Sequence, residues 1–384
     1  MDLTKSTLGK CILFGTLYFP EGLMGALATV IVPLYLASKG YSASIVGLVM
    51  GLTTIPWVIK FVWGFIVDYN ISKGRRYFIL IGGMLGAAMS VLLFFISPSW
   101  IFIFTAALFI ARSGIAILDV STDAFSIETT KFYERGKVNG SMFFGQLSGF
   151  ALGSVVLTKI STISFPVVFL SVGILIMSLI AIVLFSKDVI ERKHHISFND
   201  LIYAFKHKAI FLVILFAVFV GIPSGFITGM ATYYMKEYLT ISVTAIGIIT
   251  LFNGVSNAVG AYIFGTLSDK VGRKRTLIFA IIPALVVALL LATLKLFSMI
   301  YIVYGIFVGG ITAVLCALFM DLTSKKVAAT EYAILTSLAN LGIFIGTVTS
   351  GFLLQSTSPS MFFLFSALLY LPSIFILYLL SRKL

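Results

Sequence analysis

The chain alternates between long apolar stretches and short polar segments. Each stretch is long enough to cross the roughly 30 Å hydrocarbon core of a bilayer as a helix of about 20 residues. Polar positions gather in the connections and do not alternate with apolar ones, as they would in strands. The pattern predicts twelve membrane-spanning helices, at residues 8–37, 44–67, 77–96, 99–121, 139–158, 164–186, 209–235, 243–268, 276–294, 297–320, 331–354 and 361–381.

Composition excludes a soluble protein. Hydrophobic residues make up 60% of the chain and charged residues 11%, with a mean hydropathy of +1.11. Soluble domains are about 45–50% apolar and about 25% charged. The first apolar stretch is too long for the core of a cleaved signal peptide, so we expect it to be the first spanning helix. The sequence predicts an all-α membrane protein surrounded by lipid, and the two cysteines, Cys11 and Cys316, indicate neither a disulfide framework nor a metal site.

The net charge of +13 would suggest a nucleic-acid partner in a soluble protein, but here it follows the topology. With both termini on one side, that side carries 21 Lys and Arg residues and the opposite side four. Cytoplasmic loops are enriched in Lys and Arg. We therefore expect a multi-pass protein of the cell membrane with both termini in the cytoplasm, and no nucleic-acid partner.

The longest polar segment, residues 187–208, lies near the middle of the chain and carries five basic residues. We interpret it as a cytoplasmic linker between an N-terminal six-helix bundle (1–186) and a C-terminal one (209–384). Residues 197–208 form a candidate amphipathic helix on the membrane surface. His194 and His195 are interpreted as solvated linker residues, with a metal-binding or pH-sensing role as the alternative.

The two halves carry matching features. Pro20-Glu21-Gly22 is followed 203 residues later by Pro223-Ser224-Gly225, each near the middle of a span. Proline and glycine there predict interrupted helices, which in transporters point to the binding site. Other glycines, in 82–86 and 342–346, are expected to let helices approach closely.

A short basic motif occurs once in each half. The clearer copy, G-T-L-S-D-K-V-G-R-K-R, occupies residues 265–275, and the aspartates of the two copies are 201 residues apart. We expect the aspartate to pair with basic loop residues or to cap a helix, and the arginines to pair with acidic groups of adjacent helices. The candidate gating-loop residues are Gly64, Asp68, Arg75, Arg76, Gly265, Asp269, Gly272, Arg273 and Lys274.

This motif resembles the signature loop of the major facilitator superfamily. The resemblance extends to twelve spans in two halves, with a basic central linker between them. It implies two pseudo-symmetric six-helix bundles, a monomer, a central cavity lined by the first, fourth, seventh and tenth helices, and secondary active transport by alternating access.

A narrower resemblance is to muropeptide permeases of the AmpG type and the related acetyl-coenzyme A and folate–biopterin transporters. It rests on K-F-V-W at 60–63, D-V-S-T-D-A at 119–124, E-R-G at 134–136 and A-T-E-Y-A-I-L-T-S at 329–337. Leu118 stands where that family has glutamine. The resemblance implies a polar or anionic organic solute.

Two charges fall near the middle of spans, where a charge costs about 2.5–3.5 kcal/mol on insertion scales. Glu21 is in the first span and Arg112 in the fourth. We expect Glu21 to carry a coupling proton and Arg112 to pair with it or to bind an anionic part of the solute. The alternative is a permanent ion pair that only fixes helix packing.

Asp119 and Asp123 lie one turn apart in the fourth span, and we place both at its cytoplasmic end. They are candidates for the transport pathway or for gating pairs with Arg75 and Arg76, and gating is favoured for Asp123. Other charges are expected to be peripheral: Lys60 extends toward the cytoplasm in a structural role, Glu128 is a loop charge, and Asp321 is the counterpart of Asp119 in the second half.

These features predict a secondary active transporter, proton-coupled and acting as a symporter of a muropeptide-like or cofactor-like solute. The alternative within transport is proton-antiport efflux of amphipathic compounds. A membrane sensor or intramembrane enzyme is a remote alternative. No nucleotide-binding loop, enzyme constellation or cofactor motif is evident.

Overall fold

The computed structural model describes residues 2–188, 208–293, 296–322 and 328–381, and these residues form helices and the connections between them. Twelve of the helical segments are long and apolar enough to cross a membrane, and each corresponds to one of the predicted stretches. The predicted all-α membrane fold is confirmed. The predicted amphipathic linker helix and the two linker histidines lie outside the described residues.

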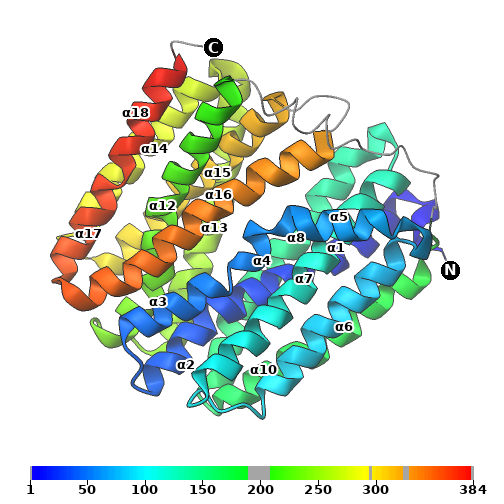
Figure 1. The fold of residues 1–384 in the computed structure, drawn as a ribbon, viewed down its shortest axis with the longest axis horizontal. Helices are drawn as coiled ribbons and strands as arrows, with labels where there is room; N and C mark the ends of the chain where they lie inside the picture. The colour runs from blue at the N-terminus through cyan, green and yellow to red at the C-terminus, as the bar shows by residue number, and fades with distance from the viewer. Residues whose placement is uncertain (1, 189–207, 294–295, 323–327, 382–384) are drawn as a thin grey trace. The chain divides into compact units, whose positions relative to one another are not determined.

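The first six spans are built from ten α-helices, several of which join end to end (Figure 1). They are α1 (Thr7–Ala26), α2 (Val32–Ser38), α3 (Ala43–Leu52), α4 (Ile55–Val58), α5 (Lys60–Tyr69), α6 (Arg75–Leu93), α7 (Ile101–Thr129), α8 (Arg135–Leu152), α9 (Thr158–Ser161) and α10 (Phe165–Ile180). Two π-helical segments, Leu27–Ile31 and Gly153–Leu157, join α1 to α2 and α8 to α9.

The last six spans are less divided. They are α12 (Lys208–Glu237), α13 (Val243–Val271), α14 (Arg273–Leu291), α15 (Phe297–Leu322), α16 (Ala328–Ser356), and the pair α17 (Pro359–Leu368) and α18 (Tyr370–Ser381).

The chain forms two compact units that are not continuous in sequence. The first comprises Met1–Lys39, Ile59–Lys193 and Ile241–Leu251, and the second Gly40–Val58, His194–Thr240 and Phe252–Leu384. The second span therefore contributes α3 and α4 to one unit and α5 to the other. The division of the sequence into bundles 1–186 and 209–384 remains a prediction.

Glycines allow the closest helix contacts in each unit. In the first unit, a Cβ at Gly22 would overlap the backbone of Gln146, which shows how closely α1 approaches α8. In the second, a Cβ at Gly346 would overlap the carbonyl of Ile222, so α12 and α16 meet in the same way. A Cβ at Gly82 would lie 2.6 Å from the Gly114 carbonyl oxygen. The predicted packing role of the glycines in 82–86 and 342–346 is confirmed.

The predicted interruptions at Pro20 and Pro223 are wrong, because both prolines lie inside continuous helices. The second span is interrupted instead, between α3 and α4 and again at Ile59. Pro56 has no N–H to donate to the carbonyl of Leu52, and the chain turns there through the Thr54 to Gly51 hydrogen bond of 2.8 Å. The break sets Lys60 at the first position of α5.

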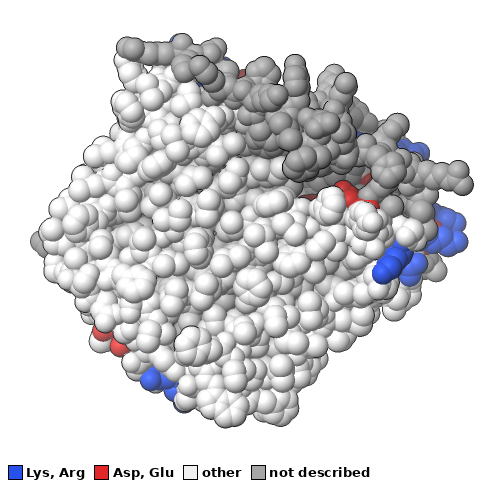
Figure 2. Space-filling model, viewed as in Figure 1, with Lys and Arg blue, Asp and Glu red and all other residues white. Residues whose placement is uncertain are grey.

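Charged side chains are rare on the surface of the spans. On the face shown in Figure 2, Lys, Arg, Asp and Glu gather near its margins, and the described surface between them is uncharged. Large apolar side chains such as Phe102, Phe144 and Tyr262 are more than 70% exposed. Such a surface suits contact with lipid chains.

Candidate functional site

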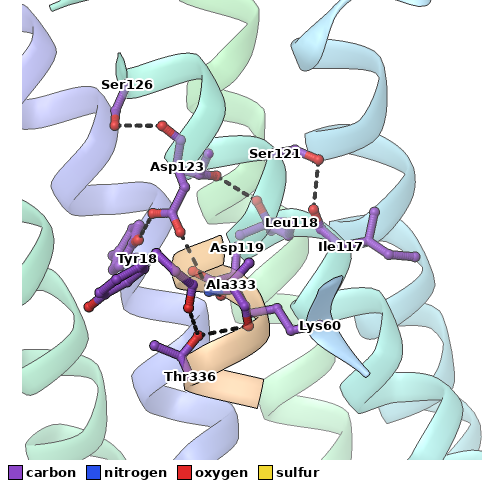
Figure 3. A network of polar contacts seen from close by, with 12 residues as sticks. Tyr18, Lys60, Ile117, Leu118, Asp119, Ser121, Asp123, Ser126, Ala333 and Thr336 are labelled. Carbon is purple, nitrogen blue, oxygen red and sulfur yellow. Dashed lines mark hydrogen bonds and ion pairs between the residues drawn. The ribbon is translucent and has the colours of Figure 1, made fainter. Parts of the chain in front are cut away.

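A cluster of ionisable side chains lies inside the first unit, between α1, α5 and α7. The ammonium of Lys60 is 2.6 Å from a carboxylate oxygen of Asp119 and 3.5 Å from one of Asp123. Tyr18 donates a short hydrogen bond to the other oxygen of Asp123. Figure 3 shows the Asp123 carboxylate between the Tyr18 hydroxyl and the Lys60 ammonium. One lysine is thus shared by two carboxylates one helical turn apart.

Burial differs sharply within this cluster. The side chain of Asp119 is 2% exposed, that of Lys60 22% and that of Asp123 40%. Asp119 therefore depends on Lys60 for compensation of its charge, because water cannot reach it. Asp123 is the member that solvent or a solute can reach.

Glu21 extends the cluster along α1. Its Oε2 atom is buried and accepts no hydrogen bond from the described residues, while the side chain of Gln146 on α8 lies within hydrogen-bonding reach of the carboxyl group. Arg112, 9% exposed, donates to the carbonyl of Met24 at 3.4 Å, one turn further along α1. The Glu21–Arg112 pairing remains a prediction.

Packing of the surrounding helices fixes these positions. The ring of Phe14 meets that of Phe125 edge to face, with centroids 5.6 Å apart, and this contact joins α1 to α7. The close contact at Gly22 places Gln146 beside Glu21. Both features lie within one turn or two of the charged residues, so the aromatic and glycine contacts set the spacing of the charges.

One prediction about this cluster is wrong, and another was incomplete. Helix α7 continues to Thr129, eight residues beyond the predicted end, so Asp119 and Asp123 lie inside a helix and not at its end. Lys60 pairs with the two aspartates, which the prediction of a lysine extending toward the cytoplasm did not include. Its structural role remains a prediction. A snorkelling lysine was expected because no partner for it is visible within its own span.

The two loop motifs form matching ion-pair triads. In the first unit, Arg75 pairs with Asp68 at 2.9 Å and with Glu128 at 2.7 Å. In the second, Arg273 pairs with Asp269 at 2.5 Å and with Asp321 at 2.9 Å. The expected pairing of the motif's aspartate and arginine with each other and with an adjacent helix is confirmed.

These triads correct three expectations. Asp123 does not pair with Arg75 or Arg76, as the gating prediction required, but with Lys60. Arg75 pairs with Asp68 and Glu128 instead, and Arg76 donates its backbone N–H to Asp188 at 3.1 Å. Glu128 is therefore a helical ion-pair partner and not a loop charge. Since Asp321 holds the second arginine as Glu128 holds the first, its counterpart is Glu128 rather than Asp119.

The glycines before the two arginines share one backbone conformation. Gly74 has φ +84° and ψ 157°, and Gly272 has φ +95° and ψ 150°. Residues with a Cβ rarely adopt this region. The motif therefore requires glycine at the N-cap of α6 and of α14 so that the following arginine enters the helix facing its acidic partners.

A further ion pair lies outside the cluster. Glu134, just before α8, accepts hydrogen bonds from Lys10 at 2.6 Å, from Thr7 at 2.6 Å and from the Lys131 backbone at 3.0 Å. These hydrogen bonds, that of Lys10 first, lower the pKa of Glu134 to about 2. The E-R-G segment thus anchors the start of the first span.

Tyr18 and Gln146 are cluster members that the sequence did not single out as such. Tyr18 precedes Glu21 by three residues on α1, and Gln146 is a polar residue in the fifth span; helical spacing could have suggested the first. Among the described residues, no group of three or more His, Cys, Asp and Glu side chains is placed to hold a metal ion.

Comparison with known proteins identifies relatives. Residues 14–238 and 214–383 match the family model of the Major Facilitator Superfamily. The chain is 30% identical over 168 residues to the class H tetracycline resistance protein of Pasteurella multocida, covering 42% of this chain and 41% of that protein. It is 24% identical over 386 residues to a candidate transporter, AmpG 1, of Rickettsia bellii (strain RML369-C), covering 91% and 93%.

A solved structure shares the fold over the whole chain. The nucleoside transporter NupG superimposes with a TM-score of 0.77 at 13% identity, covering 100% of this chain and 99% of that one. The AmpG relative and NupG are transporters by name. The family match supports secondary transport of a small-molecule solute, and the twelve candidate spans are those of a multi-pass membrane protein. The match of the family model over most of the chain, together with the twelve candidate spans, shows that the chain belongs to the Major Facilitator Superfamily.

Proposed function

We propose that this protein couples the movement of a proton to the uptake of a polar or anionic organic solute. It acts as a monomer in the cell membrane, with both termini in the cytoplasm. The observation that carries the proposal is the buried carboxylate oxygen of Glu21, which accepts no hydrogen bond within the part of the chain that the structure describes and lies in the same cluster as the Lys60–Asp119 ion pair. The distribution of Lys and Arg supports the orientation.

The charge of the cluster supports proton coupling. It contains three carboxyl groups, on Glu21, Asp119 and Asp123, and two cations, on Lys60 and Arg112. With every group ionised, one negative charge is uncompensated. An unpaired charge inside a membrane protein is costly, and one bound proton removes it. Uptake and release of that proton would change the attraction between Lys60 and its two carboxylates.

Roles within the cluster follow from burial. Glu21 holds the coupling proton, since its buried oxygen lacks a donor. Asp123 exchanges protons with water or contacts the solute, because it is 40% exposed. Arg112 pairs with Glu21 when the latter is ionised or holds an anionic group of the solute, and Asp119 keeps Lys60 in position.

The loop triads are proposed to gate the pathway. The first consists of Asp68, Arg75 and Glu128, with Gly64 and Arg76 alongside. The second consists of Asp269, Arg273 and Asp321, with Gly265, Gly272 and Lys274 alongside. Each triad crosses three spans, so a movement of one helix must break or stretch an ion pair.

The solute class rests on the relatives. The AmpG relative, matched over nearly its full length, favours a muropeptide-like or cofactor-like solute. The match to a tetracycline resistance protein favours the second candidate, proton-antiport efflux of amphipathic compounds. In either candidate function, Glu21 is proposed to carry the proton.

The test is a thermal-shift measurement on purified protein with muropeptide, acyl-coenzyme A, pterin and drug ligands at pH 5.5 and 7.5. We expect one ligand to stabilise the protein by an amount that depends on pH, and Glu21→Gln to remove that dependence. Glu237→Gln, an exposed glutamate at the end of α12, is the matched control and should retain it. A ligand whose pH dependence survives in Glu21→Gln would refute Glu21 as the proton carrier. Flux assays in vesicles with the identified ligand then separate uptake from efflux.

A further inference from the structure

The second unit contains a cavity of about 220 Å³ among α12, α15, α16 and α18. Its walls include Ala217, Val220 and Ile343, and none of its lining residues carries a charge. A dry apolar cavity of about 150 Å³ is enough to hold benzene. This cavity therefore has room for a ring with a substituent.

Two polar groups facing the cavity are left without a protein partner. Thr312 and Thr336 also line it, but their hydroxyls donate to carbonyls of their own helices at 2.9 and 3.0 Å. The side chains of Ser224 on α12 and Asn340 on α16 make no hydrogen bond with the described residues. They offer a hydroxyl and an amide, each able both to donate and to accept.

Tyr370 lines the cavity at its α18 end and is held there by a hydrogen bond. Tyr370, fully buried, shares a 2.7 Å hydrogen bond with the hydroxyl of Tyr304. The Tyr304 hydroxyl also lies 3.5 Å from the carbonyl of Pro223, the neighbour of Ser224. Tyr370 is thereby fixed against the segment that carries Ser224.

We propose that this cavity binds an uncharged, ring-sized organic group, whose faces contact the apolar walls and whose polar edge hydrogen-bonds to Asn340 and Ser224. An anionic group is disfavoured because no cation is found among the described residues that line the cavity, and a buried charge without a partner is costly. A neutral amide or hydroxyl would satisfy the two side chains that lack partners. The inference stands on the second unit alone and does not depend on proton coupling.

Cys316 provides a direct measure of occupancy, because it lines the cavity. The only other cysteine of the chain, Cys11, is on α1 in the first unit. In a Cys11→Ser protein, alkylation by N-ethylmaleimide therefore reports on Cys316 alone. A ligand present at twice its dissociation constant slows alkylation about threefold by mass action.

The probes are benzamide and benzoate, which match in size and differ in charge. Benzamide is expected to slow alkylation of Cys316 about threefold at a concentration where benzoate leaves the rate unchanged. Equal protection by the two, or protection by neither, would overturn the proposal. The measurement uses purified protein without a proton gradient.

Variants test the polar edge. Asn340→Leu keeps the side-chain volume and removes the amide, and is expected to abolish protection by benzamide. Ser224→Ala provides an independent test with a smaller change, in case the leucine variant does not fold. Thr349→Val, on the exposed side of the same helix, is the matched control and should retain protection. Full protection in both Asn340→Leu and Ser224→Ala would refute the assigned contacts.

One more variant separates this inference from the proposed function. Glu21→Gln is expected to leave protection by benzamide unchanged while removing the pH dependence of solute binding. Loss of protection in Glu21→Gln would overturn the assignment of the ligand site to the second unit alone.

Discussion

The two units place opposite chemistry on corresponding spans. Glu21 on α1 belongs to a cluster of charges in the first unit, whereas Ser224, at the matching position of the proline–glycine repeat, lines an uncharged cavity in the second. Both positions lie next to a glycine at which two helices meet closely. The repeat thus preserves the backbone contact, while the residue between proline and glycine is free to differ.

This difference divides two tasks that a coupled transporter has to perform. A charged cluster can change its net charge by one proton, and the second unit's cavity, having no charged lining residue, cannot respond to pH in that way. A neutral cavity can select a ligand by shape and hydrogen bonding without responding to protons. Each of the following predictions alters one side of the comparison.

The largest effect is expected from removing the shared lysine. Lys60→Met leaves Asp119, 2% exposed, without a cation, and breaking a buried pair costs about 3–5 kcal/mol. We expect a large fall in the thermal stability of purified protein and loss of transport. The control is the double variant Lys60→Met with Asp119→Asn, which should regain most of the stability and none of the transport. A double variant as unstable as the single one would show that the pair does not set the cost.

A smaller loss of stability is expected when the arginine of either triad is replaced. The two triads share a geometry but differ in burial. The side chain of Arg75 is 7% exposed and that of Arg273 24%, and both acidic partners of Arg273 are more than half exposed. Arg75→Gln should cost about 3 kcal/mol, the low end of the range for breaking a buried pair, and Arg273→Gln less than about 1 kcal/mol because exposed pairs contribute little. Denaturation of the two variants side by side measures this. Equal losses would mean that burial does not distinguish the triads.

The twelve spans were predictable because length and apolarity alone decide which segments can cross a membrane. The three acidic residues of the cluster could also be predicted as candidates, since a charge within a span is costly and is seldom found there without a partner or a function. The pairing of Lys60 was not, because it depends on the break in the second span and on how α5 approaches α7. The end of α7 was placed too early because Asp119 and Asp123 look like the polar end of a span until their partner is seen.

The counterparts in the two halves show a related limit. Sequence spacing alone matched Asp321 to Asp119, 202 residues earlier. The structure matches it to Glu128, because each holds the arginine of its own loop motif. Insertions between repeats shift the spacing, so a shared partner identifies equivalent residues better than a constant offset does.

The smallest effect is expected from Glu134→Gln, as a change in how thermal stability depends on pH. Glu134 forms an ion pair with Lys10 in the first unit, outside the charged cluster. Its pKa of about 2 in the folded protein lies below the value of about 4.3 for an unfolded chain. The stabilisation is therefore complete above about pH 4.3 and is lost as the pH falls toward 2. We expect the thermal stability of the wild type to decline over this range more steeply than that of Glu134→Gln, measured in detergent. Parallel profiles for the two proteins would mean that the hydrogen bonds from Lys10 and Thr7 do not favour the ionised carboxylate, and that the first span is anchored at its start by packing alone.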